Sequence, residues 1–408
     1  MSTSTSPGST KMDNAREMLA SEQISFVQRI TRVQALQVVI VLIVLIAIFS
    51  AMAPEAFPTW FNVRNILQNT AIFAVLGVGA TFVIITAGID LSIGSVLVFS
   101  SVVSAQAMGA LGSKMTEMYM DGSLASGPLA NALVPGIDAA GGDAMMAFGP
   151  SGWLIAVFGV LVALASGCAW GLLNGFLIAK AKVPAFIVTL GTLGMALGFS
   201  QVITGGVDVT TVPAALVENV GFGDLIWQLP VLVVISAIIV VLGGILLHRT
   251  LFGLYTYAVG SNPEGCRRVG IKVDRQLMWV YVLSGATAGI AGIMSLALYQ
   301  QTTIGGQSLT NLTVIAGVVI GGTSLFGGVG TIFGTVIGLL IPVVLQSGFI
   351  IIGVESFWQN VVIGMFLIAA VYIDGLRRAR ATRSSGKKTR HLQVGGVQLG
   401  NNRKEGTE

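Results

Sequence analysis

The sequence has very little charge for its length. Only 10% of its 408 residues are Asp, Glu, Lys or Arg, whereas 54% are hydrophobic, and the mean hydropathy is +0.85. A soluble globular domain is about 25% charged. So low a content of charged residues therefore excludes a soluble globular domain and predicts an integral membrane protein. The formal charge of +4 does not indicate nucleic-acid binding, since the basic residues are spread over tails and loops beside apolar runs.

Cysteine and histidine are also scarce. Cys168 lies inside an apolar run and Cys266 in a basic loop, so we expect neither a disulfide nor a metal site. His248 and His391 both lie in polar segments outside the apolar runs. Nothing resembles a nucleophile–base pair. The chain is therefore predicted to be non-catalytic and to bind no cofactor of its own.

Apolar runs long enough to cross a membrane, each needing roughly 17–25 residues, recur along the chain. They predict an all-α integral membrane protein of about ten transmembrane helices. The eighth and ninth are short and glycine-rich. The predicted spans are residues 36–53, 67–87, 92–110, 153–179, 183–203, 229–247, 279–298, 309–322, 331–346 and 358–374.

Tails and loops complete the predicted organisation. Residues 1–35 form an N-terminal tail with an interfacial helix over 15–32, and residues 36–374 form the transmembrane domain. Residues 111–152 form a long outer loop insertion, and residues 375–408 form a basic C-terminal tail. The first apolar run follows a polar tail, so we expect no cleavable signal peptide.

The distribution of positive charge predicts the orientation. If the N-terminus lies inside and the spans alternate, all but two of the 22 Lys and Arg residues, Arg64 and Lys114, fall on the inner side. The outer loops 111–152 and 204–228 are acidic. So large a bias supports an even number of spans, with both termini in the cytoplasm.

A weak internal sequence similarity predicts an inverted repeat. The segment around Gly175 to Gly191 resembles the segment around Gly348 to Gly364, at one constant offset. The two copies are five predicted spans apart and so have opposite orientations, as in the inverted repeats of many transporters. Chance similarity between apolar, glycine-rich segments is the competing explanation.

A basic gap interrupts the apolar pattern at residues 248–278. It carries five arginines and lysines against only Glu264 and Asp274. Basic loops between spans are expected on the cytoplasmic side. A short helical loop held there is placed to pass mechanical work from a cytoplasmic protein into the membrane.

Asp90, in the sequence GIDLSIGS at 88–95, is the one acidic residue predicted to lie within the membrane region. Burying charge there is costly. One interpretation is structural, in which Asp90 or Ser92 caps the third span. The others are direct contact with a solute at a broken helix, and a proton relay, which usually needs several intramembrane acids or histidines.

A second glycine-rich break lies at residues 321–330. It lacks the Gly-Lys-Ser/Thr ending of a phosphate-binding loop, so we expect a tight turn between closely packed helices. Uncharged polar residues in and around the breaks and spans suit a path for a neutral, hydroxyl-rich solute, although each alone is more often a contact between helices. The residues proposed for the path or for support of the breaks are Asp90, Ser92, Asn174, Thr189, Asn311, Thr323, Ser324 and Gln359.

Several segments together resemble the permease subunits of bacterial ATP-binding-cassette importers for monosaccharides, of the ribose/xylose/arabinose type. The matching segments occur in the family's order over roughly residues 60–375. They are GIDLSIGS at 88–95, PAFIVTLGT at 184–192, RTLFG at 249–253, AVGSNPE at 258–264, VGI at 269–271, IAGVVIGGTSLFGGVG at 315–330 and WQNVVIG at 358–364.

The resemblance implies a partner for the basic loop. It implies a coupling contact with a cytoplasmic ATPase, made by Gly260, Asn262, Glu264, Arg267, Arg268 and Gly270. It also implies ATP and Mg on that ATPase, an extracytoplasmic sugar-binding protein, a second permease chain and a bacterial cytoplasmic membrane. One departure is the Gly265-Cys266 pair, where the family commonly has two alanines.

Other functions stay open from the sequence. The same architecture suits a cassette permease for a branched-chain amino acid, a nucleoside or an autoinducer. An ion-coupled secondary transporter is a rival of a different class, which the sparse intramembrane charge disfavours. A membrane enzyme is a third, disfavoured because no polar catalytic cluster is present.

Overall fold

The structure is a computed structural model that describes residues 34–120, 152–225, 228–305, 310–355 and part of 358–375. The predicted N-terminal tail up to residue 33, residues 121–151 of the outer loop and the C-terminal tail from residue 376 lie outside the described residues.

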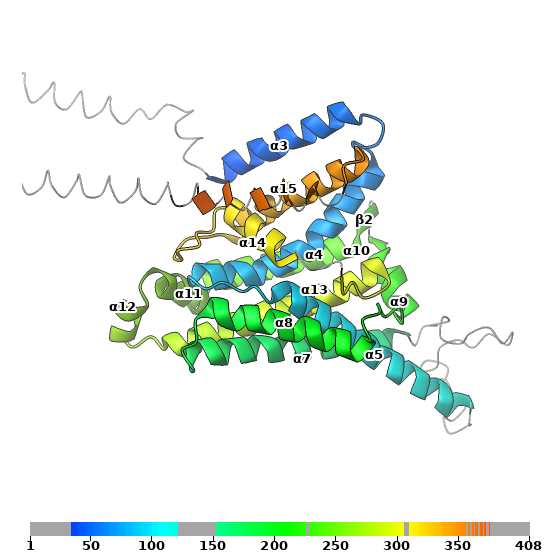
Figure 1. The fold of residues 1–408 in the computed structure, drawn as a ribbon, viewed down its shortest axis with the longest axis horizontal. Coiled ribbons are helices and arrows are strands. Elements are labelled where there is room, and N and C mark those ends of the chain that lie inside the picture. The colour runs from blue at the N-terminus through cyan, green and yellow to red at the C-terminus, as the bar shows by residue number, and fades with distance from the viewer. Residues whose placement is uncertain are drawn as a thin grey trace, which may run out of the picture.

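Long apolar helices packed side by side make up the described chain (Figure 1). This confirms the all-α membrane class. Seven helices are long and apolar enough to cross a membrane, and α3 and α14 contain shorter apolar stretches. The helices are α3 (Gln34–Met52), α4 (Trp60–Ile85), α5 (Ile93–Met120), α7 (Gly152–Ala179), α8 (Ala185–Thr204), α10 (Val231–Arg249), α13 (Val273–Tyr299), α14 (Thr310–Ile320) and α15 (Ile332–Ile351).

The tenth predicted span, 358–374, is only partly described, and each of its described residues is helical. Several helices extend beyond their predicted ends. The helix α4 starts at Trp60 and includes Arg64, and α13 starts at Val273, which shortens the basic loop. Hydropathy ends a span at its first polar residue. A helix can continue past a charged residue when that charge is paired. Arg64, for example, lies 2.7 Å from Asp224.

The described part of the predicted outer loop 204–228 is folded. It contains α9 (Ala214–Leu216), a π-helical turn η1 (Val217–Gly221) and the strand β1 (Asp224–Leu225), which pairs antiparallel with β2 (Leu229–Pro230). The Arg64 guanidinium donates to Asp224 and, at 2.9 Å, to the Phe222 carbonyl. These elements lie at the end of the bundle opposite α11 (Leu251–Ser261) and α12 (Pro263–Arg268) (Figure 1).

The helix α4 is the most enclosed of the described spans, and α13 packs closely on α7 through small residues. A Cβ atom added at Gly285 would lie 2.1 Å from the Gly167 carbonyl oxygen, so glycine is required for this close approach. The helices α7, α8 and α10 instead expose large apolar side chains such as Leu161, Phe186 and Leu242. Exposed apolar faces of this kind are those expected to meet lipid.

Candidate functional site

The first helix break joins α4 to α5 through residues 86–92. Two non-helical carbonyls in this segment are bonded by side chains from other helices. Asn311, on α14, donates to the Leu91 carbonyl at 2.8 Å, and the Thr189 hydroxyl of α8 lies 3.2 Å from the Ile89 carbonyl. Backbone polar groups that leave a helix within a membrane protein need such partners.

Asp90 lies at the centre of this break and is buried. One carboxylate oxygen accepts from the backbone N–H of Ser92 at 2.9 Å and from its hydroxyl at 2.6 Å. The other oxygen accepts from the hydroxyl of Ser284 on α13 at 2.7 Å. Asp90 therefore closes a turn just before α5 and ties it to α13.

Asn174 completes the cluster, because its amide nitrogen donates to the Ser92 hydroxyl oxygen at 2.9 Å. Five of the predicted residues thus gather at one break: Asp90, Ser92, Asn174, Thr189 and Asn311. Sequence reasoning missed Ser284, because nothing marks it among the many small residues of its helix.

The second break, between α14 and α15, is a tight glycine turn, as expected. Gly322, Gly327 and Gly328 have positive φ values of 102°, 81° and 76°, which glycine adopts without strain. Thr323 is buried in this turn, and Ser324 accepts from the Phe326 N–H at 3.3 Å. Neither makes a described bond to the Asp90 cluster, nor does Gln359, which is buried in the partly described tenth span.

The basic loop forms two short helices with well-defined ends. The Asn262 side chain caps α12 by accepting from the Gly265 N–H at 2.8 Å, and Pro263 occupies the first helical position. After α12, Gly270 has a φ of +88°, and the N–H groups of Gly270 and Ile271 bond back to the helix. This is the Schellman ending of a helix, which favours glycine at that position.

The Gly265-Cys266 pair has a structural explanation. Cys266 is buried and packs with Val259 of α11 and Val273 of α13, so its side chain helps to join the three helices. A Cβ atom at Gly265 would lie 3.0 Å from the Asn262 amide nitrogen, so glycine leaves room for the cap.

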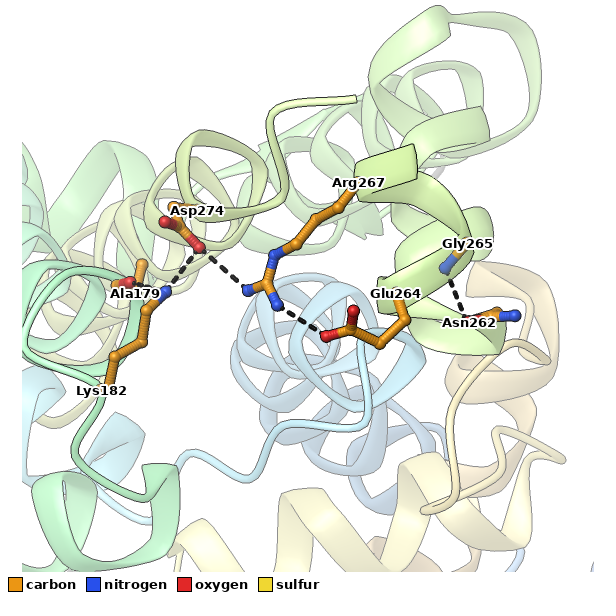
Figure 2. Close-up of polar contacts among 7 residues, drawn as sticks. All are labelled: Ala179, Lys182, Asn262, Glu264, Gly265, Arg267 and Asp274. Atoms are coloured by element: carbon orange, nitrogen blue, oxygen red, sulfur yellow. Dashed lines mark hydrogen bonds and ion pairs between the residues drawn. The ribbon is translucent and has the colours of Figure 1, made fainter. Parts of the chain in front are cut away.

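A chain of ion pairs connects α12 to two neighbouring segments (Figure 2). Arg267 lies 3.0 Å from Glu264 and 3.3 Å from Asp274 at the start of α13. Lys182, in the turn between α7 and α8, reaches the same Asp274 oxygen at 2.7 Å. These groups are well exposed, so each pair stabilises little, but together they orient α12.

The loop also touches both helix breaks directly. A Cβ atom at Gly260, near the end of α11, would lie 1.7 Å from the Ile85 carbonyl oxygen, where α4 ends, and 2.9 Å from the Gly328 nitrogen. Gly328 donates to that same Ile85 carbonyl at 2.8 Å. The Tyr257 hydroxyl of α11 donates to the Gly330 carbonyl at 2.6 Å. The structure thus joins α11, the end of α4 and the second break into one packed unit.

Residues 62–371, which include both breaks and the basic loop, match the family described as "Branched-chain amino acid transport system / permease component". The chain belongs to this permease family. It is therefore a multi-pass membrane protein and an ATP-binding-cassette transporter permease.

Named relatives agree over most of the chain. The ribose import permease protein RbsC of Escherichia coli (strain K12) is 35% identical over 337 residues, which are 81% of this chain and 90% of the relative. The D-allose transport system permease protein AlsC of the same strain is 33% identical, covering 81% and 88%. The fructose import permease protein FrcC of Rhizobium meliloti is 31% identical, covering 80% and 81%. No solved structure matches.

Proposed function

We propose that this permease is the membrane-spanning subunit of an ATP-driven importer that moves a monosaccharide, a pentose or a similar sugar, into a bacterial cell. The observation that carries the proposal is its 35% identity to a ribose import permease over 81% of the chain. Relatives named for fructose and D-allose support the same class of solute.

The permease itself hydrolyses no ATP in this proposal. A cytoplasmic ATPase binds ATP and Mg, an extracytoplasmic protein delivers the sugar, and a second permease chain, identical to the first, completes the path. Both termini lie in the cytoplasm. The positive charge of the α11–α13 region supports this orientation, since Arg268, Lys272 and Arg275 are exposed at that end.

The described contacts support a coupling role for α12. Its cap, its Schellman ending and its ion pairs give it a defined shape that an ATPase surface would recognise. When the ATPase closes and displaces α12, α11 moves with it. Gly260 packs on the Ile85 carbonyl, and the Tyr257 hydroxyl donates to the Gly330 carbonyl, so the displacement reaches the ends of the spans at both breaks.

The sugar would pass beside these breaks, at the interface of the two permease chains. Both Asp90 oxygens and the hydroxyl of Ser92 are engaged in described bonds, which favours support of the break over direct contact with the solute for these groups. High affinity for the sugar would then belong to the binding protein.

A second candidate substrate is a branched-chain amino acid, because the description of the matching family names it. The proteins that distinguish the two are the full permease, its cognate ATPase and its cognate binding protein, reconstituted in liposomes. We expect ATP-dependent uptake of a labelled sugar such as ribose, fructose or D-allose. Uptake of leucine and of none of these sugars would show that the substrate is a branched-chain amino acid. Uptake driven by a proton or sodium gradient without the ATPase would overturn the proposal.

A further inference from the structure

A cleft of about 570 Å³ opens between α11 and the beginning of α13, beside the coupling loop. Phe252 and Tyr255 line it from α11, and Lys272, Arg275 and Trp279 line it from the α13 side. The Gln276 amide nitrogen donates to the Phe252 carbonyl and to the Thr256 hydroxyl oxygen, both at 2.9 Å. These two bonds hold α11 against α13, so the cleft belongs to the folded loop itself.

The cleft has a strong positive charge. Lys272 and Arg275 are exposed, and among the described residues no acidic side chain lines it. The nearest acidic side chain in sequence, Asp274, does not line the cleft and is paired with Lys182 and Arg267. In the described part of the chain, neither Lys272 nor Arg275 forms an ion pair. An anionic group entering the cleft would therefore meet two uncompensated cations.

The position of the cleft favours lipid as the source of that group. On α13, Arg275 and Gln276 lie four and three residues before Trp279, so the lining continues from the loop along one side of that helix. Trp279 is 50% exposed, and α11 exposes Leu251 and Leu254 by 66% and 59%. Exposed leucines beside tryptophan, tyrosine and basic residues are typical of the interface between lipid headgroups and acyl chains.

We propose that this cleft binds the phosphate headgroup of an anionic phospholipid from the adjacent leaflet. Lys272 and Arg275 would contact the phosphate, and the Trp279 ring would lie against the upper part of the acyl chains. A lipid bound there braces α11, whose other end packs on Ile85 and Gly328. The proposal does not depend on which solute the permease carries.

Native mass spectrometry of the full-length permease, released from nanodiscs of phosphatidylcholine and phosphatidylglycerol, tests the proposal. We expect the wild type to retain phosphatidylglycerol. The double variant Lys272→Gln, Arg275→Gln should retain it about 10- to 30-fold more weakly, because each basic residue near an anionic lipid surface contributes about 1 kcal/mol and about 1.4 kcal/mol corresponds to a tenfold change. The matched control Arg249→Gln, Arg268→Gln removes the same charge from exposed residues that do not line the cleft.

The swap Lys272→Arg, Arg275→Lys keeps the charge and should keep the lipid, and a melting curve shows that each variant is folded. Equal loss in the control pair would mean general surface attraction and would overturn the site. Displacement of the lipid by millimolar inorganic phosphate would identify a free-anion site instead. Displacement by the ATPase would identify the cleft as a protein contact, and either result would overturn the proposal.

Discussion

Asp90 illustrates how much a single buried residue can determine at a helix break. Its carboxylate accepts three bonds, two from Ser92 and one from Ser284, and so holds the turn before α5 against α13. Bonds to a charged group contribute about 1.5–3 kcal/mol each, and a buried donor left without a partner costs about 1–3 kcal/mol.

We therefore expect Asp90→Ala to destabilise the folded permease by at least about 3 kcal/mol. Asp90→Asn should lose less, because its amide oxygen still accepts from Ser92 and the shape is kept. Thermal unfolding of both variants in detergent measures the difference. Equal melting temperatures for the wild type and Asp90→Ala would show that the carboxylate is dispensable for the fold.

Gly260 is the residue at which the loop and the first break meet most closely. A Cβ atom there would overlap the backbone of Ile85, which has no freedom to rotate away. We expect Gly260→Ala to displace α11 and to lower sugar uptake per ATP hydrolysed by the reconstituted transporter. Overpacking of this kind costs about 1–3 kcal/mol.

Gly244→Ala is the matched control for Gly260, because Gly244 lies in the helix α10 with nothing within 4 Å of the added carbon. Parallel measurements of uptake and ATP hydrolysis would separate a local contact from a general effect of adding a methyl group. If both variants couple hydrolysis to uptake as the wild type does, the contact with Ile85 transmits nothing.

At the scale of the element, α12 has only six residues and depends on its ends. Asn262→Ala removes the cap and should cost about 1 kcal/mol of helix stability. We expect a several-fold weaker association with the ATPase, measured by copurification, while the protein still inserts into the membrane. Asn262→Asp keeps an oxygen that can accept from Gly265 and should retain the partner; loss in both variants would point to a direct contact of the amide instead.

The ends of α4 and α13 bear on the predicted inverted repeat. The helices α4 and α13 have 26 and 27 residues, and each is followed closely by a non-glycine residue with a φ of 59°, Ala87 or Gln300. These helices are the second and seventh predicted spans, five apart, as an inverted repeat requires. The likeness supports the repeat, which stays a prediction.

For the whole molecule, the proposed orientation places α12 in the cytoplasm and the turn between α3 and α4 outside, at opposite ends of the bundle (Figure 1). Both native cysteines are free, so they can be replaced by alanine to give a cysteine-free background. In that background, Glu55→Cys should react with a membrane-impermeant maleimide in spheroplasts, and Arg268→Cys only after permeabilisation. Both side chains are exposed. The reverse labelling pattern would show that the chain has the opposite orientation in the membrane.

The sequence predicted the features that depend on composition and local pattern. Hydropathy located the helices, because an apolar run of that length is stable only within a membrane or a large core. The cluster of positive charge located the loop at 248–278, the Gly and Asp residues at 88–95 located the first break, and the glycines at 321–330 located the second. Helix ends were less accurate, since Arg64 continues α4 through an ion pair with a residue far along the chain.

Only the tertiary structure decided which of these features touch. Ser284 reaches Asp90 across 194 positions of sequence, and Gly260 meets Ile85 where two separate helices end. A local sequence pattern does not predict such partners, because they result from how the helices pack. The sequence by itself thus determined a multi-span permease with a basic loop and two breaks. The packing decided that the loop bears on both breaks, since close approach of backbones depends on the positions of whole helices.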